Sequence, residues 1–246
     1  MKRDVLVIAH RGASDFLPDN TLESFDQAIL EKADMLELDV RQTADGQLVL
    51  FHDWYMKRPA NNSHTPAISR PVSHALFEQL QSACEERGII LATLEEILAR
   101  YGNRININIE LKAGGYEKKV VEMVRKYGLG GSVVLSSFFP WVIMKLKDID
   151  SSIRTGWIVG QEQVVSANRL ARAILSFVFG KVKADSAHFH YEIITPEIIH
   201  RYHSRDIPVY AWTVNDTDVM SHLIKLGVDG IITNKPGQLN SIINER

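Results

Sequence analysis

Ile105-Asn106-Ile107-Asn108-Ile109-Glu110-Leu111-Lys112 is a stretch in which apolar and polar residues alternate strictly. Successive side chains of a β-strand point to opposite faces, so the pattern predicts a strand with one apolar and one polar face. In a closed barrel the apolar face meets the surrounding helices and the polar face lines the interior. Glu110 and Lys112 then lie at the mouth formed by the carboxyl ends of the strands. An edge strand with one solvated face explains the same alternation.

The rest of the chain favours the barrel, because predicted strands and helices alternate along it. We expect strands near 5–9, 34–40, 105–111, 132–137, 153–159, 182–189, 207–214 and 229–233. We expect helices near 20–32, 93–101, 116–127, 139–148, 162–178, 195–204, 216–226 and 236–244. Eight strand-helix units predict an α/β protein of the (β/α)8, or TIM barrel, class.

The domain organisation follows from the length and from one segment outside this rhythm. A chain of 246 residues fits one α/β barrel, so we expect a single domain over 1–246. The segment 53–92 contains Pro59, Pro66 and Pro71 before a weak helical pattern near 73–83. We interpret 53–92 as a small insertion at the barrel mouth, after the second strand region. A surface excursion that only covers the barrel end is the alternative.

Composition argues against several classes of partner. Lys plus Arg (28) nearly balance Asp plus Glu (30), which gives a net charge of −2 and no general attraction to nucleic acid. The only cysteine, Cys84, cannot form an intrachain disulfide, and the first residues are too polar for a signal peptide. We therefore expect a cytoplasmic protein. The oligomeric state is left open.

One apolar stretch, 170–179, has basic residues nearby and suits either a lipid surface or a helix packed on the barrel. We favour the packed helix and do not expect membrane contact.

Chemically reactive residues gather at the predicted strand ends. His10-Arg11-Gly12 follows the first strand, and Glu37 and Asp39, two residues apart, share one face of the second. Two neighbouring carboxylates repel each other, and one takes up a proton unless a cation holds both ionised. With Glu110 they form an oxygen site without a thiol, which suits Mg²⁺, Ca²⁺ or Mn²⁺ better than zinc. We therefore expect one divalent metal ion.

The remaining polar residues of this group indicate phosphate chemistry. His10 and His52 are suited to general acid and base catalysis. Arg11 and Lys112 supply positive charge for a phosphate. Taken singly, each residue also has a structural explanation, such as a hydrogen-bonded histidine at a strand end. A glycosidase also uses paired acids on a barrel, but that explains the two histidines and the two cations poorly.

These residues occur in an ordered set of short motifs. The sequence reads His10-Arg11-Gly12, Pro18-Asp19-Asn20-Thr21, Glu37-Leu38-Asp39, His52-Asp53, Glu110-Leu111-Lys112, Ser137-Phe138 and Ala211-Trp212-Thr213-Val214-Asn215. The set resembles the glycerophosphodiester phosphodiesterase family over nearly the whole chain except the insertion. The resemblance implies hydrolysis of glycerophosphodiesters to sn-glycerol 3-phosphate and an alcohol.

The resemblance also implies roles for individual residues. Glu37, Asp39 and Glu110 would bind the divalent cation, and His10 and His52 would exchange protons with the attacking and leaving oxygens. Arg11 and Lys112 would neutralise the phosphate oxygens. In the mechanism proposed for the family, the glycerol 2-hydroxyl attacks phosphorus and gives a cyclic phosphate that water opens, with the metal as Lewis acid and template.

Two departures from the family pattern concern contacts around this site. Asp19 stands where the family usually has Glu, so we expect a supporting contact near His10 to be altered or to pass through water. Residues 54–60 replace the usual continuation after His52-Asp53, so recognition of the leaving alcohol does not carry over.

Several alternatives remain open on the sequence alone. Trp212, at the end of a strand, either forms the glycerol side of the pocket or packs in the core, and Phe138 has the same ambiguity. His188 and His190 are interpreted as polar rim, with a substrate role as the alternative. A phospholipid phosphodiesterase of the sphingomyelinase D kind would stop at a cyclic phosphate. A barrel that only binds phosphate and metal is the non-enzymatic alternative.

Overall fold

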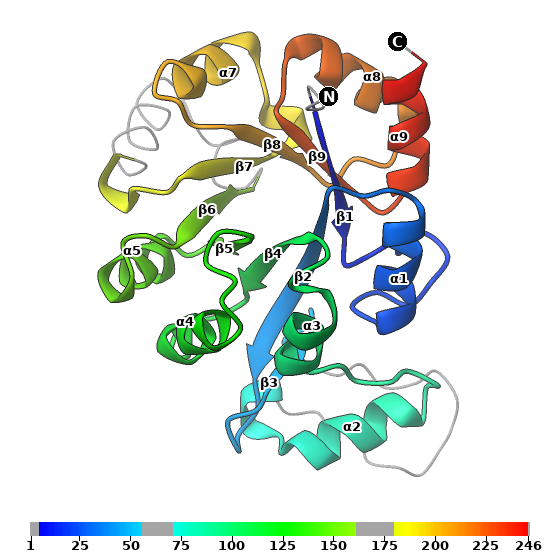
Figure 1. The fold of residues 1–246 in the computed structure, drawn as a ribbon, viewed down its shortest axis with the longest axis vertical. Coiled ribbons are helices and arrows are strands. Elements are labelled where there is room, and N and C mark those ends of the chain that lie inside the picture. The colour runs from blue at the N-terminus through cyan, green and yellow to red at the C-terminus, as the bar shows by residue number, and fades with distance from the viewer. Residues whose placement is uncertain (1–4, 56–70, 161–179, 246) are drawn as a thin grey trace.

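The computed structural model describes residues 5–55, 71–160 and 180–245. Eight parallel strands pair side by side, and the first pairs with the last, so the sheet closes into a ring (Figure 1). Around the ring they are β1 (Leu6–His10), β2 (Met35–Gln42), β4 (Asn106–Leu111), β5 (Val133–Ser137), β6 (Arg154–Val159), β7 (Ser186–His190), β8 (Val209–Trp212) and β9 (Gly230–Thr233). The predicted (β/α)8 barrel is confirmed.

Helices surround this ring (Figure 1). They are α1 (Leu22–Leu30), α3 (Leu94–Tyr101), α4 (Glu117–Lys126), α5 (Pro140–Ile149), α7 (Pro196–His203), α8 (Thr217–Leu226) and α9 (Pro236–Asn244), with a short 3-10 turn η3 (Tyr191–Ile193) after β7. Helix α3 begins at Thr93, whose hydroxyl accepts a hydrogen bond from the Glu96 N–H while the Glu96 carboxylate accepts one from the Thr93 N–H. This reciprocal cap defines the start of α3 after the preceding loop.

The alternating stretch at 105–112 behaves as the barrel requires. Ile107, Ile109 and Leu111 are fully buried in the main core between the strands and the helices. The opposite face points into the barrel, where Glu110 belongs to the same polar group as Lys112. Strand β4 pairs with β2 on one side and β5 on the other, so the edge-strand alternative is wrong.

The lower part of the barrel interior is apolar. Side chains from five strands form a separate buried cluster: Ile8, Met35, Val134, Tyr210 and Ile232. A residue two positions further along β1 or β2 faces the same interior, one layer nearer the mouth. His10 and Glu37 occupy that layer, directly above Ile8 and Met35. The polar side chains of β1 and β2 therefore lie one layer above this apolar cluster, at the mouth.

The insertion packs beside β2 and the short strand β3 (Leu48–Leu50) that precedes it. Strand β3 runs antiparallel to β2, followed by the 3-10 turn η1 (Val72–His74) and helix α2 (Phe77–Glu85). Helix α2 lies outside the ring of the other helices (Figure 1). It shares a satellite core with β3, formed by Val49, Val72, Leu80, Cys84 and Leu91. The helix predicted near 73–83 is therefore present, displaced by a few residues.

One predicted strand boundary is wrong. The strand expected over 182–189 begins only at Ser186, because residues 180–182 are helical and Lys183 has a positive φ of 54°. Val182 lies in this turn and is buried in the main core. In the sequence, a buried apolar residue at this position looks the same as a buried strand residue. The helix expected over 162–178 and the whole apolar stretch at 170–179 lie outside the described residues.

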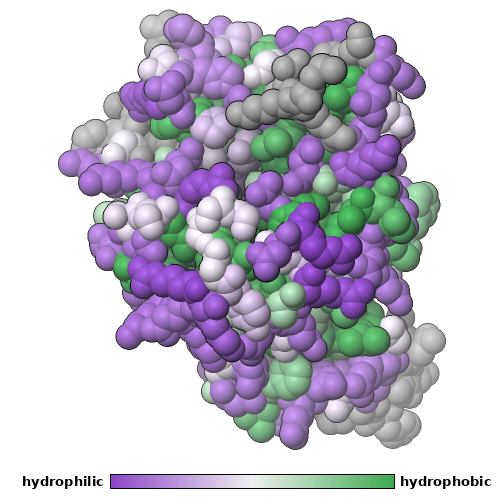
Figure 2. Space-filling model, in the orientation of Figure 1, coloured by the Kyte–Doolittle hydropathy of each residue, from purple (hydrophilic) through white to green (hydrophobic). Residues whose placement is uncertain are grey.

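The surface in Figure 2 carries hydrophilic side chains over most of this face, with hydrophobic ones between them. Among the described residues, no helix is both long and apolar enough to cross a membrane.

Candidate active site

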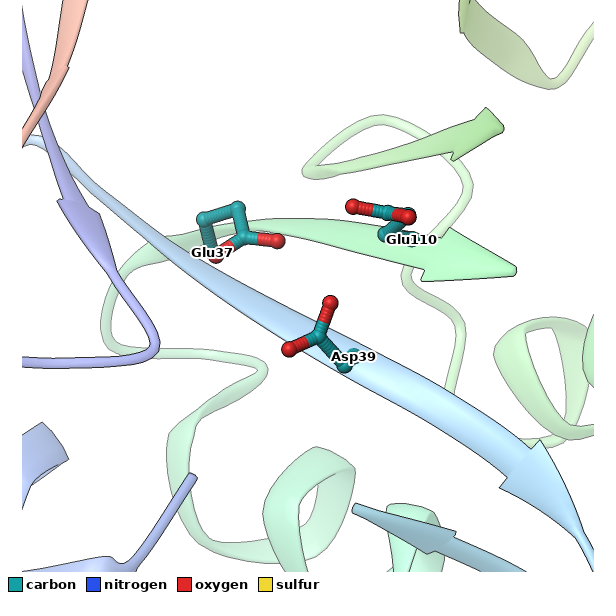
Figure 3. A group of neighbouring side chains, drawn as sticks. All are labelled: Glu37, Asp39 and Glu110. Atoms are coloured by element: carbon teal, nitrogen blue, oxygen red, sulfur yellow. The ribbon is translucent and has the colours of Figure 1, made fainter. Parts of the chain in front are cut away.

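Three carboxylates meet at the mouth of the barrel. Glu37 and Asp39 extend from β2 and Glu110 from the neighbouring β4, and Figure 3 shows the three side chains turned toward a common space. One oxygen of each lies within 4.8 Å of the other two, and all three residues are buried. The register explains the meeting, because Asp39 pairs directly with Glu110 across the two parallel strands. The predicted acidic group is thus brought together.

Two cations partly balance these charges. Nζ of Lys112 lies 2.6 Å from Oε1 of Glu110 and 3.4 Å from Oδ1 of Asp39, and Nε of Arg11 lies 2.8 Å from Oδ2 of Asp39. The backbone N–H of Arg11 also donates to Oε2 of Glu37 at 3.0 Å. Since two cations face three carboxylates, ionisation of all three would leave an excess of negative charge.

The pKa values of the carboxyl groups separate accordingly. Burial, reinforced by the charges of Asp39 and Glu110, raises the pKa of Glu37 well above its usual value. Burial likewise raises the pKa of Glu110 to about 7. For Asp39 burial acts in the same direction, but Lys112 and Arg11 outweigh it and lower the pKa to about 2. A further positive charge between these groups would hold all three ionised.

His10 is held by the far end of the chain. Its Nδ1 lies 2.7 Å from Oδ1 of Asn234, which follows β9. An amide oxygen only accepts, so Nδ1 carries the proton and Nε2 keeps its lone pair. Burial and the Arg11 charge lower the pKa of His10 to about 4. His10 is therefore a neutral imidazole, ready to accept a proton at Nε2.

The turn after His10 depends on a glycine. Gly12 has a φ of 88°, and a Cβ on it would lie 2.4 Å from Oγ of Ser24 in α1. Only glycine fits both the conformation and the close approach. Ser24 in turn donates to the Arg11 carbonyl, which fixes Arg11 beside the carboxylates.

His52 enters the site from the segment after β3. Its Nδ1 lies 2.8 Å from Oδ1 of Asp53, so the same tautomer is favoured as in His10. Burial and the Lys112 and Arg11 charges lower the pKa of His52. The side chain remains about 39% exposed, so it stands at the rim.

These residues line one cavity of about 110 Å³. It contains both histidines, Arg11, Lys112, Glu37 and Glu110, together with Asn108, Phe138, Ile158, His188, Trp212, Thr213 and Ile232. Every predicted site residue except Asp39 is among them, and Asp39 lies behind, tied to both cations.

Trp212 both lines the cavity and packs against neighbouring rings. Its ring lines the cavity and packs edge-on against Phe138 and His190, with ring centroids 5.3 Å away in each case. Its Nε1–H donates to the His188 carbonyl.

The interpretation of His188 as polar rim is wrong, because this side chain is only 1% exposed inside the barrel. Its Nε2 lies 2.9 Å from the Ser186 hydroxyl. His190, by contrast, is half-buried beside Glu192.

Asp19 contacts the site directly. Its Oδ2 accepts a hydrogen bond of 2.8 Å from Nη1 of Arg11. The neighbouring Asn20 joins the site as well: its Nδ2 donates to Oδ2 of Asp39, and its Oδ1 accepts from the Asp39 N–H. The contact that we expected near His10 is therefore made to Arg11, without an intervening water.

Sequence reasoning missed two residues that support the site. Asn234 orients His10, and its position directly after the last strand was a usable signal, since barrel sites form at such ends. Arg41 contacts His52, and its position two residues after Asp39 places it on the same face of β2. Neither residue lies in the motifs that carried the resemblance.

Two solved structures of similar shape are named phosphodiesterases. A glycerophosphodiester phosphodiesterase from Agrobacterium tumefaciens aligns over 96% of this chain and 99% of its own with a TM-score of 0.76 and 25% identity. An Oleispira antarctica phosphodiesterase, solved in complex with the product sn-glycerol-3-phosphate, covers 97% and 96% with a TM-score of 0.77 and 23% identity. At that identity the second likeness concerns the fold.

Sequence comparison decides the family. A glycerophosphodiester phosphodiesterase from Caldanaerobacter subterraneus subsp. tengcongensis is 30% identical over 98% of both chains. The glycerophosphoryl diester phosphodiesterase family matches residues 10–238. The chain belongs to this family. The glycerophosphoryl diester phosphodiesterase match begins at His10 and includes every site residue described above, so the resemblance seen in the motifs is confirmed.

Proposed function

We propose that this chain hydrolyses glycerophosphodiesters to sn-glycerol 3-phosphate and an alcohol, with a divalent metal ion and two histidines. The observation that carries the proposal is the buried group of Glu37, Asp39 and Glu110, in the same cavity region as a neutral His10. The names of the related proteins support the same substrate class.

The carboxylate group fits a hard cation. Oδ1 of Asp39 is buried and accepts no hydrogen bond from the described residues, since its nearest cation, Nζ of Lys112, lies 3.4 Å away and is 2.6 Å from the buried Oε1 of Glu110. Carboxylate oxygens without sulfur or nitrogen ligands suit Mg²⁺, Ca²⁺ or Mn²⁺. Glu37, Asp39 and Glu110 would hold the ion. When bound, it would supply Lewis-acid polarisation and offset the charge that Arg11 and Lys112 leave uncompensated.

The two histidines have complementary positions for proton transfer. Asn234 and Asp53 hold the Nδ1 protons of His10 and His52, which leaves both Nε2 atoms for chemistry. His10, with its low pKa, accepts a proton from the attacking hydroxyl at Nε2. His52 is more exposed at the rim, so its Nε2 first takes up a proton from solvent, and the resulting imidazolium, paired with Asp53, delivers that proton to the leaving alcohol.

Charge and shape complete the site. Arg11 and Lys112 face the cavity and can neutralise the phosphate oxygens, an effect that is larger in a buried site than in water. Phe138 and Trp212 form an apolar side to the same small cavity, on which the carbon chain of glycerol can pack. The leaving alcohol would then extend past His52 toward solvent.

Turnover of glycerophosphocholine and glycerophosphoethanolamine, followed by ³¹P NMR, tests the proposal. We expect sn-glycerol 3-phosphate as the final product, loss of activity with EDTA and recovery with Mg²⁺ or Ca²⁺. His10→Ala and His52→Ala should each lower kcat by about 10²–10⁴-fold. His222→Ala, an exposed histidine of α8, is the matched control and should leave kcat unchanged.

Three results would contradict the proposal in different ways. A cyclic phosphate that accumulates without opening would indicate the sphingomyelinase D-like reaction. Full activity in both histidine variants would exclude their roles in proton transfer. Binding of phosphate and metal without any turnover would leave only the non-catalytic barrel.

A further inference from the structure

Arg41 lies at the end of β2 and contacts the backbone of His52. Its Nε and Nη2 donate to the same acceptor, the His52 carbonyl oxygen, at 3.0 and 2.6 Å. Arg41 is only 4% exposed, so water competes little for these bonds. Hydrogen bonds from a charged donor are the stronger kind, and two of them converging on one oxygen restrain its position in two directions.

The segment that carries His52 needs such a restraint. Strand β3 ends at Leu50, and the last ladder-like bond runs from the Phe51 N–H to the Asp39 carbonyl at 3.1 Å. His52 comes directly after it, where the regular pairing with β2 has ended. The Arg41 side chain thus links β2 to His52, one residue beyond the last backbone hydrogen bond between β2 and the segment after β3.

The surroundings keep the Arg41 guanidinium in place. Its charged end lies 4.5 Å from the centre of the Trp54 ring, which covers it from the insertion side. Burial lowers the pKa of Arg41, while Asp39, Glu110 and Asp53 act against this. A guanidinium remains charged in proteins under these conditions. The cation is thus held between the acidic group and an aromatic ring, with its N–H groups directed at His52.

We propose that Arg41 is a positioning residue, which holds His52 at the distance and angle needed for proton transfer at Nε2. This inference rests on the proposed role of His52 in catalysis. A displacement of a catalytic group by about 1 Å can cost about 10²-fold in rate. Arg41 lines a neighbouring hollow that shares His52, Glu110 and Lys112 with the cavity, but it does not line the cavity itself, and its hydrogen bonds are made to His52.

Two substitutions separate the charge from the geometry. Arg41→Met removes both and should lower kcat about 30–100-fold while KM changes less than about threefold, since substrate contacts remain. Arg41→Lys keeps the charge but offers a single flexible ammonium in place of the planar fork, so we expect a partial loss of about 5–10-fold. Arg125→Met, at a half-exposed arginine paired with Asp150, is the matched control and should leave kcat unchanged.

A double-mutant cycle with glycerophosphocholine as substrate distinguishes positioning from general support. In a His52→Ala background, Arg41→Met should reduce the residual kcat by less than about twofold, because the group that it positions is gone. The same loss in both backgrounds would overturn the inference, as would wild-type kcat in Arg41→Met. If Arg41→Met does not fold, Arg41→Lys and its combination with His52→Ala give the same comparison.

The outcomes for the two proposals are distinguishable. Wild-type activity in His52→Ala would contradict the role proposed for His52 in the reaction. Loss of activity in His52→Ala combined with normal kinetics in both Arg41 variants would contradict only the positioning role.

Discussion

His188 is expected to control the acid stability of the barrel, and its removal tests this directly. The side chain is buried against Tyr210 and Ser186, and burial alone lowers its pKa from 6.5 to about 3. We consider His188→Gln, which places a neutral amide near the position of Nε2 and can keep a hydrogen bond to Ser186. The substitution removes the titration without emptying the site.

The size of this stability change follows from the difference in proton binding at His188 between the folded and the unfolded chain. Below pH 6.5 the unfolded chain takes up a proton at His188, whereas the folded chain does so only near pH 3. The stabilisation from neutral His188 is therefore complete above pH 6.5 and is lost as the pH falls. The loss is about 1.4 kcal/mol per pH unit, or about 3 kcal/mol on reaching about pH 4.5.

Urea unfolding at about pH 7.5 and about pH 4.5 measures the effect. Between these conditions, the free energy of unfolding of His188→Gln should fall by about 3 kcal/mol less than that of the original protein. Other groups titrate in both proteins and cancel in this difference. His222→Gln, at an exposed position, should show the same fall as the original. Equal falls for all three proteins would refute the reasoning.

Three further predictions concern stability. Mg²⁺ or Ca²⁺ at about 100 times its Kd should stabilise the protein by about 2.7 kcal/mol, seen as a rise in Tm of about 5–10 °C that Glu37→Gln diminishes. Gly156→Ala should destabilise by about 1–3 kcal/mol in urea unfolding, because its Cβ would lie 2.5 Å from Nε2 of His188. If residues 1–246 form one domain, calorimetry should show a single cooperative transition, with no separate melting of the insertion.

Much of the fold was predictable because the signals were local. The alternation over 105–112 fixed which face of β4 is apolar, and the structure buries that face under the helices. Strand β3 is not among the predicted strands, because three residues carry little periodicity. The start of β7 was misplaced, since the spacing of Val182 does not distinguish a strand from a helix end.

The site residues were predictable where two simple rules apply: residues two apart in a strand share a face, and barrel sites form at the carboxyl ends of strands. Glu37, Asp39 and Glu110 were expected together and are found together. Asn234 was not expected beside His10, because the two residues meet only when the last strand closes on the first. The burial of His188 likewise depends on the closed ring.

The sequence by itself determined the class of fold and the group of acidic, imidazole and basic side chains at the strand ends. Periodicity and motif order are properties of neighbouring residues, and they need no knowledge of the closed barrel. Only the tertiary structure decided which tautomer Asn234 imposes on His10 and which residue holds His52. These contacts join residues from separate elements, and their distances depend on how the strands stagger around the ring.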